Sequence, residues 1–281
     1  MMDAQELNRL WQSYQLRVTD EIAKSPEVLF CNGSAIGTLG NFSASTGKAK
    51  SKKTFNVSAI LAAALTNGEV LRYIAEFPDD KRTILYFDTE QSPHHCQRVM
   101  KRALRLAGLP VDRHPENLIF AQLRAITPDL RLELIDNAIA NTPNVGLVII
   151  DGVRDLMFDI NNAIESSRLI GKLMEWTDKY QIHIHTVLHL NKSDDNVRGH
   201  VGTELNNKAE TVLQVCKSTT DSEVTEVSAS CIRSMDFPPF AFIVNESGLP
   251  EIAADYTFAG KSKVQTFSYS ELSPEQHRQA L

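Results

Sequence analysis

A lysine-rich stretch of this chain has the residue types and spacing of a phosphate-binding loop. It follows the pattern G-x-x-x-x-G-K-[S/T] at each fixed position except the sixth, where Lys52 replaces glycine. In such a loop, backbone N–H groups at a helix N-terminus surround phosphate oxygens, the lysine reaches the β- and γ-phosphates, and the hydroxyl residue holds Mg²⁺. Lys53 and Thr54 occupy those two positions. The loop residues are Gly47, Lys48, Ala49, Lys50, Ser51, Lys52, Lys53 and Thr54.

The lysine at the sixth position departs from the phosphate-loop pattern in a way that affects the backbone conformation. Glycine is used where a backbone needs a positive φ or must approach a ligand closely, so Lys52 predicts either a strained loop or a changed path. The loop's four lysines repel one another unless an anion lies among them. This repulsion favours phosphate binding over a lysine-rich turn that binds nothing.

Two predicted strands end in carboxylates. The apolar run 82–87 is followed by Asp88, Thr89 and Glu90, and the apolar run 145–150 is followed by Asp151. A carboxylate at the end of the second run, on a strand that we expect beside the phosphate loop, can hold a water on the Mg²⁺. The sequence therefore predicts an acidic group about 100 residues downstream of the lysine loop that completes a metal and phosphate site.

Strands and helices alternate through most of the chain, which predicts a parallel sheet. After residue 210, three strands follow one another without helices, which predicts an antiparallel extension of the sheet at its C-terminal side. The expected fold is thus an α/β fold with a mostly parallel central sheet. The expected strands are 28–31, 41–46, 82–87, 118–121, 145–150, 182–188, 212–215, 225–232 and 240–244, and the expected helices are 55–65, 93–107, 127–140 and 162–180.

The two ends of the chain and one internal segment are expected to lie outside this core. Residues 3–24 carry apolar side chains at helical spacing, which predicts an amphipathic helix that packs within the chain or docks on a neighbouring subunit. The polar, glycine-punctuated segment 192–202 predicts a mobile loop. We expect an N-terminal helix at 1–26, a core at 27–259, and a C-terminal extension at 260–281 in which Ser273-Pro274 opens a helix.

Composition limits the classes of function. A formal net charge of −6 argues against a generally basic nucleic-acid coat, so nucleic-acid contact needs a local basic face. The four cysteines form no C-x-x-C pair, which predicts neither a zinc site nor disulfides and points to a reducing cytoplasmic compartment. No apolar run is long enough to predict a membrane segment. His183, His185 and His189 share one face of a strand, where hydrogen-bonded polar residues are a better interpretation than a metal site.

Together these motifs resemble the RecA-like P-loop ATPase core of hexameric helicases and recombinases. They are most similar to the RepA/DnaB-type helicases and to related AAA ATPases of mobile elements. The resemblance covers about residues 27–256. It rests on the lysine loop, on Asp88-Thr89-Glu90, and on the sequences L-V-I-I-D-G, V-L-H-L-N-K and R-G-H-V-G-T-E-L.

The resemblance implies roles for particular residues. It implies ATP and Mg²⁺ held by Lys53, Thr54 and Asp151. Glu90 resembles the glutamate that polarises the attacking water, with Asp88 as the alternative carboxylate. His189 resembles the residue that senses the γ-phosphate. Arg233 resembles the basic residue that a neighbouring subunit inserts into the ATP site. The residues of the segment that resembles the DNA-facing loop are Lys192, Arg198 and His200.

The function expected from this resemblance is ATP binding and hydrolysis coupled to nucleic acid, as a helicase or a replication or mobilisation ATPase. The expected partners are further copies of the chain in a homo-oligomer, such as a hexameric ring, and single-stranded DNA. Two alternatives stay open. A nucleotide-binding switch with little turnover is favoured by Lys52 and the acidic balance, and a DNA-tethering accessory protein would follow if a further domain begins near Ser273.

Overall fold

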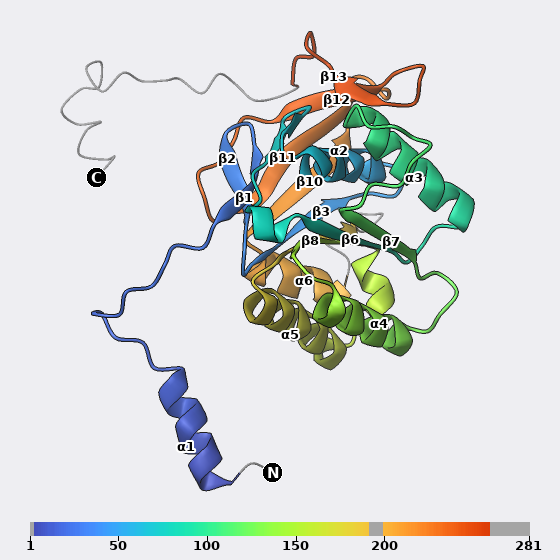
Figure 1. Ribbon diagram of the computed structural model, residues 1–281. Coiled ribbons are helices and arrows are strands. Elements are labelled where there is room, and N and C mark those ends of the chain that lie inside the picture. The colour runs from blue at the N-terminus through green and yellow to red at the C-terminus, as the bar shows by residue number, and fades with distance from the viewer. Residues whose placement is uncertain (1–2, 191–198, 259–281) are drawn as a thin grey trace, which may run out of the picture.

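A nine-stranded sheet runs through the centre of the computed structural model, which describes residues 3–190 and 199–258 (Figure 1). Its strand order is β13-β12-β11-β10-β3-β9-β8-β6-β7. The six strands from β10 to β7 in this order are parallel, and β11, β12 and β13 add to β10 in antiparallel pairs. The strands are β3 (Phe42–Gly47), β6 (Thr83–Asp88), β7 (Leu118–Gln122), β8 (Val145–Asp151), β9 (His183–His189), β10 (Thr211–Lys217), β11 (Thr225–Ile232), β12 (Phe240–Val244) and β13 (Pro250–Ile252). The expected mostly parallel sheet with an antiparallel extension is confirmed.

Helices cover both faces of the sheet, as the continuous apolar strands require, because strands such as β8 are buried along their whole length (Figure 1). One hydrophobic cluster joins the sheet to α2 and α3, and a second joins it to α4, α5 and α6. Helix α2 is apolar almost all round and lies deeply buried. The helices are α2 (Lys53–Thr66), α3 (Pro93–Leu106), α4 (Pro128–Asn141), α5 (Ala163–Tyr180) and α6 (Gly199–Lys208).

A small four-stranded sheet, with strand order β2-β1-β5-β4 in the described residues, packs against α2 in the same hydrophobic cluster. The sequence predicted one of its strands, 28–31, but not the others, nor β13 of the large sheet. Strands of two to five residues carry too few alternations of apolar and polar side chains to stand out in a sequence. The strands of the small sheet are β1 (Glu27–Cys31), β2 (Ser34–Thr38), β4 (Glu69–Val70) and β5 (Tyr73–Ala75), and two short 3₁₀ helices are η1 (Asp79–Lys81) and η2 (Val153–Leu156).

The N-terminal helix α1 (Ala4–Ser13) lies away from the α/β core and buries none of its residues (Figure 1). Asp3 and Glu6 form a capping box at its start. The helix was expected to extend to residue 24, but it ends at Ser13, and residues 14–26 make isolated turns or extended chain. Its apolar stripe is exposed, with Trp11 65% exposed, so the expected packing within the chain is wrong. Docking on a neighbouring subunit stays a prediction.

The segment expected as a mobile loop divides into two parts. Residues 191–198 lie outside the described residues, whereas residues 199–202 form the first turn of α6, so the expected loop is wrong for those residues. Gly199 has φ +72°, and a Cβ there would lie 2.4 Å from the carbonyl oxygen of Ile160, which explains the glycine at the helix start. The extension 260–281, with Ser273, also lies outside the described residues.

Candidate functional site

Eight of the predicted site residues line one hollow of about 350 Å³ at the carboxyl edge of the central sheet. Parallel strands end together at this edge, which is where ligands bind in open α/β sheets. The hollow lies over the ends of β3, β6, β8 and β9 and beside the starts of α2 and α3. Its predicted members are Lys50, Ser51, Lys52, Lys53, Thr54, Glu90, Asp151 and His189.

The phosphate loop turns sharply between β3 and α2. A Cβ on Gly47 would lie 2.2 Å from the carbonyl oxygen of Val215, so glycine is required there. Lys52 has φ +64° at the N-cap of α2, the left-handed conformation that glycine adopts without strain. Its Nζ donates a hydrogen bond of 2.6 Å to the carbonyl oxygen of Glu223, in the turn between β10 and β11. Of the two expected outcomes, a strained loop or a changed path, the left-handed φ of Lys52 favours strain, and its side chain ties the loop to the neighbouring turn.

Lys53 folds back into the loop. It is only 4% exposed, and its Nζ donates hydrogen bonds to the carbonyl oxygens of Gly47 at 2.8 Å and Lys48 at 2.9 Å. Burial lowers the pKa of Lys53 to about 8, opposed by the charges of Asp151 and Glu90. The buried Ser51 hydroxyl in the same loop has no hydrogen-bond partner. A buried cation and an unpaired donor at a helix start fit a phosphate group.

Asp151 is buried beside a second carboxylate. It pairs with Asp88 across β8 and β6, and its Oδ2 accepts a hydrogen bond of 2.9 Å from the Tyr86 hydroxyl. Burial, followed by the charge of Asp88, raises the pKa of Asp151 to about 7. Strand β9 lies between β3 and β8, so the expectation that Asp151 sits on the strand beside the phosphate loop is wrong. Asp151 reaches the hollow because both strands end at the same edge. A divalent cation bound there, with Thr54 as a second oxygen ligand, would relieve the repulsion between the carboxylates.

Glu90 and His189 meet across the hollow. His189 Nε2 lies 3.4 Å from the Glu90 carboxylate. The hydrogen bond from His189 holds the pKa of Glu90 below its usual value against the opposing effect of burial. Glu90 is therefore ionised at neutral pH and able to accept a proton or orient a water molecule.

Asp88, the alternative base, is already used by the turn after β6. Its carboxylate accepts hydrogen bonds from the backbone N–H groups of Glu90 (3.1 Å) and Gln91 (2.8 Å) and from the Gln91 side chain (2.7 Å). These bonds fix the path that carries Glu90 into the hollow. The geometry favours Glu90 over Asp88 as the residue able to orient a water molecule and accept its proton.

Other predicted site residues lie elsewhere. Arg233 follows the end of β11, whose last residues pair with the start of β10, so it lies at the opposite edge of the sheet. Its guanidinium donates to the carbonyl oxygen of Lys208, and a role in a neighbour's site stays a prediction. His200 is exposed in the first turn of α6. Lys192 and Arg198 lie outside the described residues.

The buried histidines of β9 form hydrogen bonds, as their interpretation as polar core residues requires. Ser43 Oγ lies 2.7 Å from His183 Nε2 and 2.8 Å from His185 Nδ1, and His185 Nε2 lies 2.9 Å from Ser45 Oγ. Burial lowers the pKa of His185 to about 3, so it is neutral. Across the described residues, no group of three or more His, Cys, Asp or Glu side chains is placed to hold a metal ion.

Among the lining residues that the sequence analysis missed are two arginines, Arg98 and Arg102 on α3. The available signal was a pair of arginines four residues apart, on a helix that starts directly after Glu90. Such residues share a helix face, but only the packing of α3 against α2 shows which face meets the loop.

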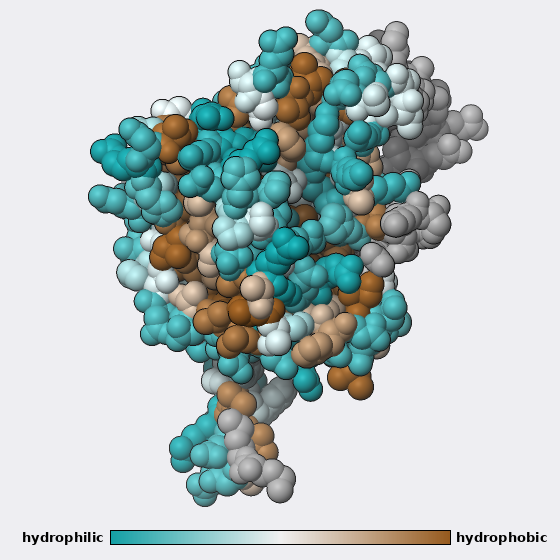
Figure 2. Space-filling model, turned by 90° about the vertical axis from the view of Figure 1, so that its right-hand side faces the viewer, coloured by the Kyte–Doolittle hydropathy of each residue, from teal (hydrophilic) through white to brown (hydrophobic). Residues whose placement is uncertain are grey.

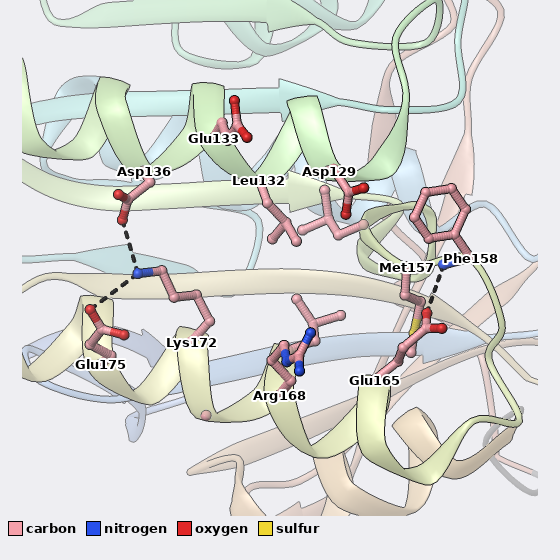
Figure 3. Close-up of a pocket in the computed structure, with 13 residues that line it drawn as sticks. Asp129, Leu132, Glu133, Asp136, Met157, Phe158, Glu165, Arg168, Lys172 and Glu175 are labelled. Carbon is pink, nitrogen blue, oxygen red and sulfur yellow. Dashed lines mark hydrogen bonds and ion pairs between the residues drawn. The ribbon is translucent and has the colours of Figure 1, made fainter. Parts of the chain in front are cut away.

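A second hollow, of about 550 Å³, lies between α4 and α5 on the other face of the sheet (Figure 3). Leu132, Leu156 and Leu169 contribute to its apolar lining. At one end, Lys172 Nζ bridges Asp136 at 3.2 Å and Glu175 at 3.1 Å. The carboxylates that outnumber the basic groups around it would repel a phosphate. They are Asp129, Glu133, Asp136, Glu165 and Glu175.

Comparison with known proteins supports a nucleotide site. A family model described as an AAA domain matches residues 24–195, which is more than half of the chain and includes the lysine loop, Glu90, Asp151 and His189. No curated protein matches the chain. Within the described residues, no helix combines the length and apolar character needed to span a bilayer.

Proposed function

This chain belongs to the AAA domain family of P-loop ATPases, and from that premise we propose that it binds ATP with Mg²⁺ at the carboxyl edge of its central sheet and hydrolyses it. The observation that carries the proposal is the convergence of a buried lysine, a hydroxyl, a shielded carboxylate and an ionised glutamate on one hollow. Lys53 and Thr54 at the start of α2, Glu90 after β6 and Asp151 at the end of β8 supply these groups from three separate segments.

Each residue has a role that its surroundings support. The N–H groups at the start of α2 and the Lys53 ammonium would hold the phosphates, and the Ser51 hydroxyl is free to donate to them. Thr54 and Asp151 would hold Mg²⁺, which neutralises charge on the phosphates. Glu90, kept ionised by His189, would orient the attacking water and accept its proton. Phosphoryl transfer asks the protein mainly for positioning and charge, and these residues provide both.

Action on nucleic acid, as a helicase or a replication or mobilisation ATPase, is part of the proposal. It is supported by the resemblance of the sequence 192–202 to a DNA-facing loop. Two further observations support a homo-oligomer. Arg233 lies too far from its own hollow to serve it, and the apolar stripe of α1 is exposed and available to a second copy. The hydrophobic side chains of α1 are visible below the core in Figure 2.

A nucleotide-binding switch with little turnover is the second candidate. The observation that favours it is the internal bonding of the loop, in which Lys53 donates to Gly47 and Lys48, and Lys52 donates to Glu223. Phosphates would have to displace the Lys53 bonds. A loop anchored at Lys52 opposes the rearrangements that accompany repeated turnover.

Steady-state ATP hydrolysis with and without single-stranded DNA separates the two candidates, with Lys53→Ala as the blank. Turnover that rises with DNA and disappears in the variant supports the nucleic-acid motor. Tight ATP binding with negligible turnover under both conditions supports the switch.

The oligomeric state is tested by light scattering coupled to gel filtration. We expect the full chain to form an oligomer and Leu10→Asp, in the middle of the exposed stripe, to shift it toward the monomer. An unchanged mass for the variant would show that α1 does not hold the copies together.

A further inference from the structure

The basic face of α3 is directed into the nucleotide hollow. Arg98 and Arg102 lie one helical turn apart and line the hollow with Lys53 and Glu90. Side chains of a helix lean toward its N-terminus, and α3 begins immediately after the turn that carries Glu90. Both residues therefore lie on the α3 side of the hollow, on the helix that follows the turn carrying Glu90.

Arg102 is already held in place. Its Cζ lies 3.7 Å from the centre of the Phe55 ring, in the first turn of α2, and its Nη1 donates to the Ser58 hydroxyl at 3.3 Å. A guanidinium stacked on an aromatic ring and bonded to a neighbouring helix has little freedom. Arg102 therefore links α3 to α2 and leaves Arg98 as the arginine that can move to a ligand.

Arg98 has an exposed side chain and carries an uncompensated charge. In the part of the chain that the structure describes, neither Arg98 nor Arg102 forms an ion pair with a carboxylate. Burial and the positive charge of Arg98 lower the pKa of Arg102 to about 10, which shows that the two guanidiniums repel each other. An anion in the hollow would relieve this repulsion.

We propose that Arg98 contacts the terminal phosphate of the bound nucleoside triphosphate from within the same chain, so that α3 distinguishes a triphosphate from a diphosphate. This inference rests on the proposed ATP site. The phosphate loop would surround the inner phosphates at the start of α2, whereas Arg98 lines the hollow from α3, the helix that follows Glu90, the residue that would orient the attacking water. A guanidinium binds phosphate oxygens through two parallel hydrogen bonds, which lysine cannot reproduce.

The consequence concerns the need for a partner. An arginine stabilises the charge of the transition state in phosphoryl transfer. It can be supplied either by the same chain or by a neighbour. With Arg98 in the hollow, a single chain already places a guanidinium near the terminal phosphate. Recognition of the triphosphate then precedes assembly and does not require Arg233 of another copy.

The test compares equilibrium affinities for ADP and for a non-hydrolysable ATP analogue, both with Mg²⁺. In Arg98→Ala we expect about tenfold or greater loss of affinity for the triphosphate, and less than about twofold change for ADP. The matched control is Arg105→Ala, because Arg105 is exposed on the same helix two turns further along and does not line the hollow. It should change both affinities by less than about twofold.

The outcomes separate this inference from the proposed function. If the wild-type chain binds both nucleotides and Arg98→Ala behaves as Arg105→Ala does, the inference is wrong while the ATP site stands. Equal losses for both nucleotides also overturn it, since they indicate contact with the inner phosphates. A wild-type chain that binds neither nucleotide overturns the proposed function itself. Arg98→Gln, which keeps most of the side chain, replaces the alanine variant if the latter does not fold, and it should show the same selective loss.

Discussion

The two faces of the central sheet are built from similar elements but carry opposite chemistry. On one face, α2 and α3 border a hollow with an excess of basic side chains, and on the other, α4 and α5 border an apolar hollow rimmed mainly by carboxylates. On the side of the molecule that carries β7 and α3, hydrophilic side chains predominate and hydrophobic ones gather in smaller patches (Figure 2). Of these two hollows, the one beside the phosphate loop has the excess of basic groups that attracts phosphate, although it is the smaller of the two.

The largest expected difference between the faces concerns catalysis. Glu90→Gln should keep ATP bound and lower the hydrolysis rate by about 10² or more, because the amide cannot accept a proton from water. Glu175→Gln, the same change on the α4–α5 face, should leave the rate within about twofold. Single-turnover measurements with radiolabelled ATP check both variants. Full activity in Glu90→Gln would show that another residue acts as the general base. It would also remove the expected difference in catalysis between the two faces.

A loss of binding is the next expected effect. Lys53→Ala removes the buried ammonium from the loop and should lower ATP affinity about a hundredfold, while circular dichroism shows an unchanged fold. Lys172→Ala, which removes an ammonium from the other hollow, should lower ATP affinity by less than about twofold. Titration calorimetry with ATP and Mg²⁺ measures both. Equal affinity in Lys53→Ala and the wild-type chain would contradict the assignment of the loop.

The two faces should also respond oppositely to pH. Because the pKa of Asp151 is raised to about 7 in the folded chain, the folded state binds the proton more tightly between about pH 4 and 7. The contribution of Asp151 to the free energy of unfolding therefore falls as pH rises through this range, by up to about 1.4 kcal/mol per pH unit. The hydrogen bond from Trp176 lowers the pKa of Asp136 on the other face, so the stability from Asp136 is instead lost as pH falls.

Urea unfolding without nucleotide or metal, at several pH values from about 2 to 8, checks this contrast, because the stability from Asp136 is lost only below the ordinary aspartate pKa of about 3.9. Asp151→Asn should flatten the fall in stability toward pH 7 and unfold at higher urea than the wild-type chain at pH 8. Asp136→Asn should lose only the decline at acidic pH. A wild-type chain whose stability rises steadily from pH 4 to 7, with no change in Asp151→Asn, would show that Asp151 is not shielded as described.

The smallest expected effect concerns backbone strain. Lys52→Gly removes the cost of a left-handed lysine, about 1 kcal/mol, and also the bond to Glu223, so stability should change by less than about 1 kcal/mol. Released from its anchor, the loop should support hydrolysis a few-fold faster. Gln181→Gly, at the left-handed C-cap of α5, should change stability similarly without altering hydrolysis. Thermal unfolding and steady-state turnover measure these effects, and loss of nucleotide binding in Lys52→Gly would identify Lys52 as a phosphate ligand.

Much of the fold was predictable because its signals are local. Continuous apolar runs such as 145–150 identified the buried strands, and proline at the first position of α3 and α4 marked their starts. The short strands β4, β5 and β13 gave no comparable signal. The N-terminal helix shows a further limit, since an apolar stripe predicts that a surface will be covered but not which molecule covers it.

The sequence by itself determined which chemistry this chain carries. The lysine loop and the carboxylates after two apolar runs are local patterns, because a helix start and a strand end each depend on a few neighbouring residues. Only the tertiary structure decided which groups meet. It placed β9 between the loop strand and that of Asp151, joined His189 to Glu90, turned Arg98 toward the hollow, and left Arg233 at the opposite edge. Strand order and helix orientation follow from burying apolar surface between distant segments, and residue spacing does not encode that outcome.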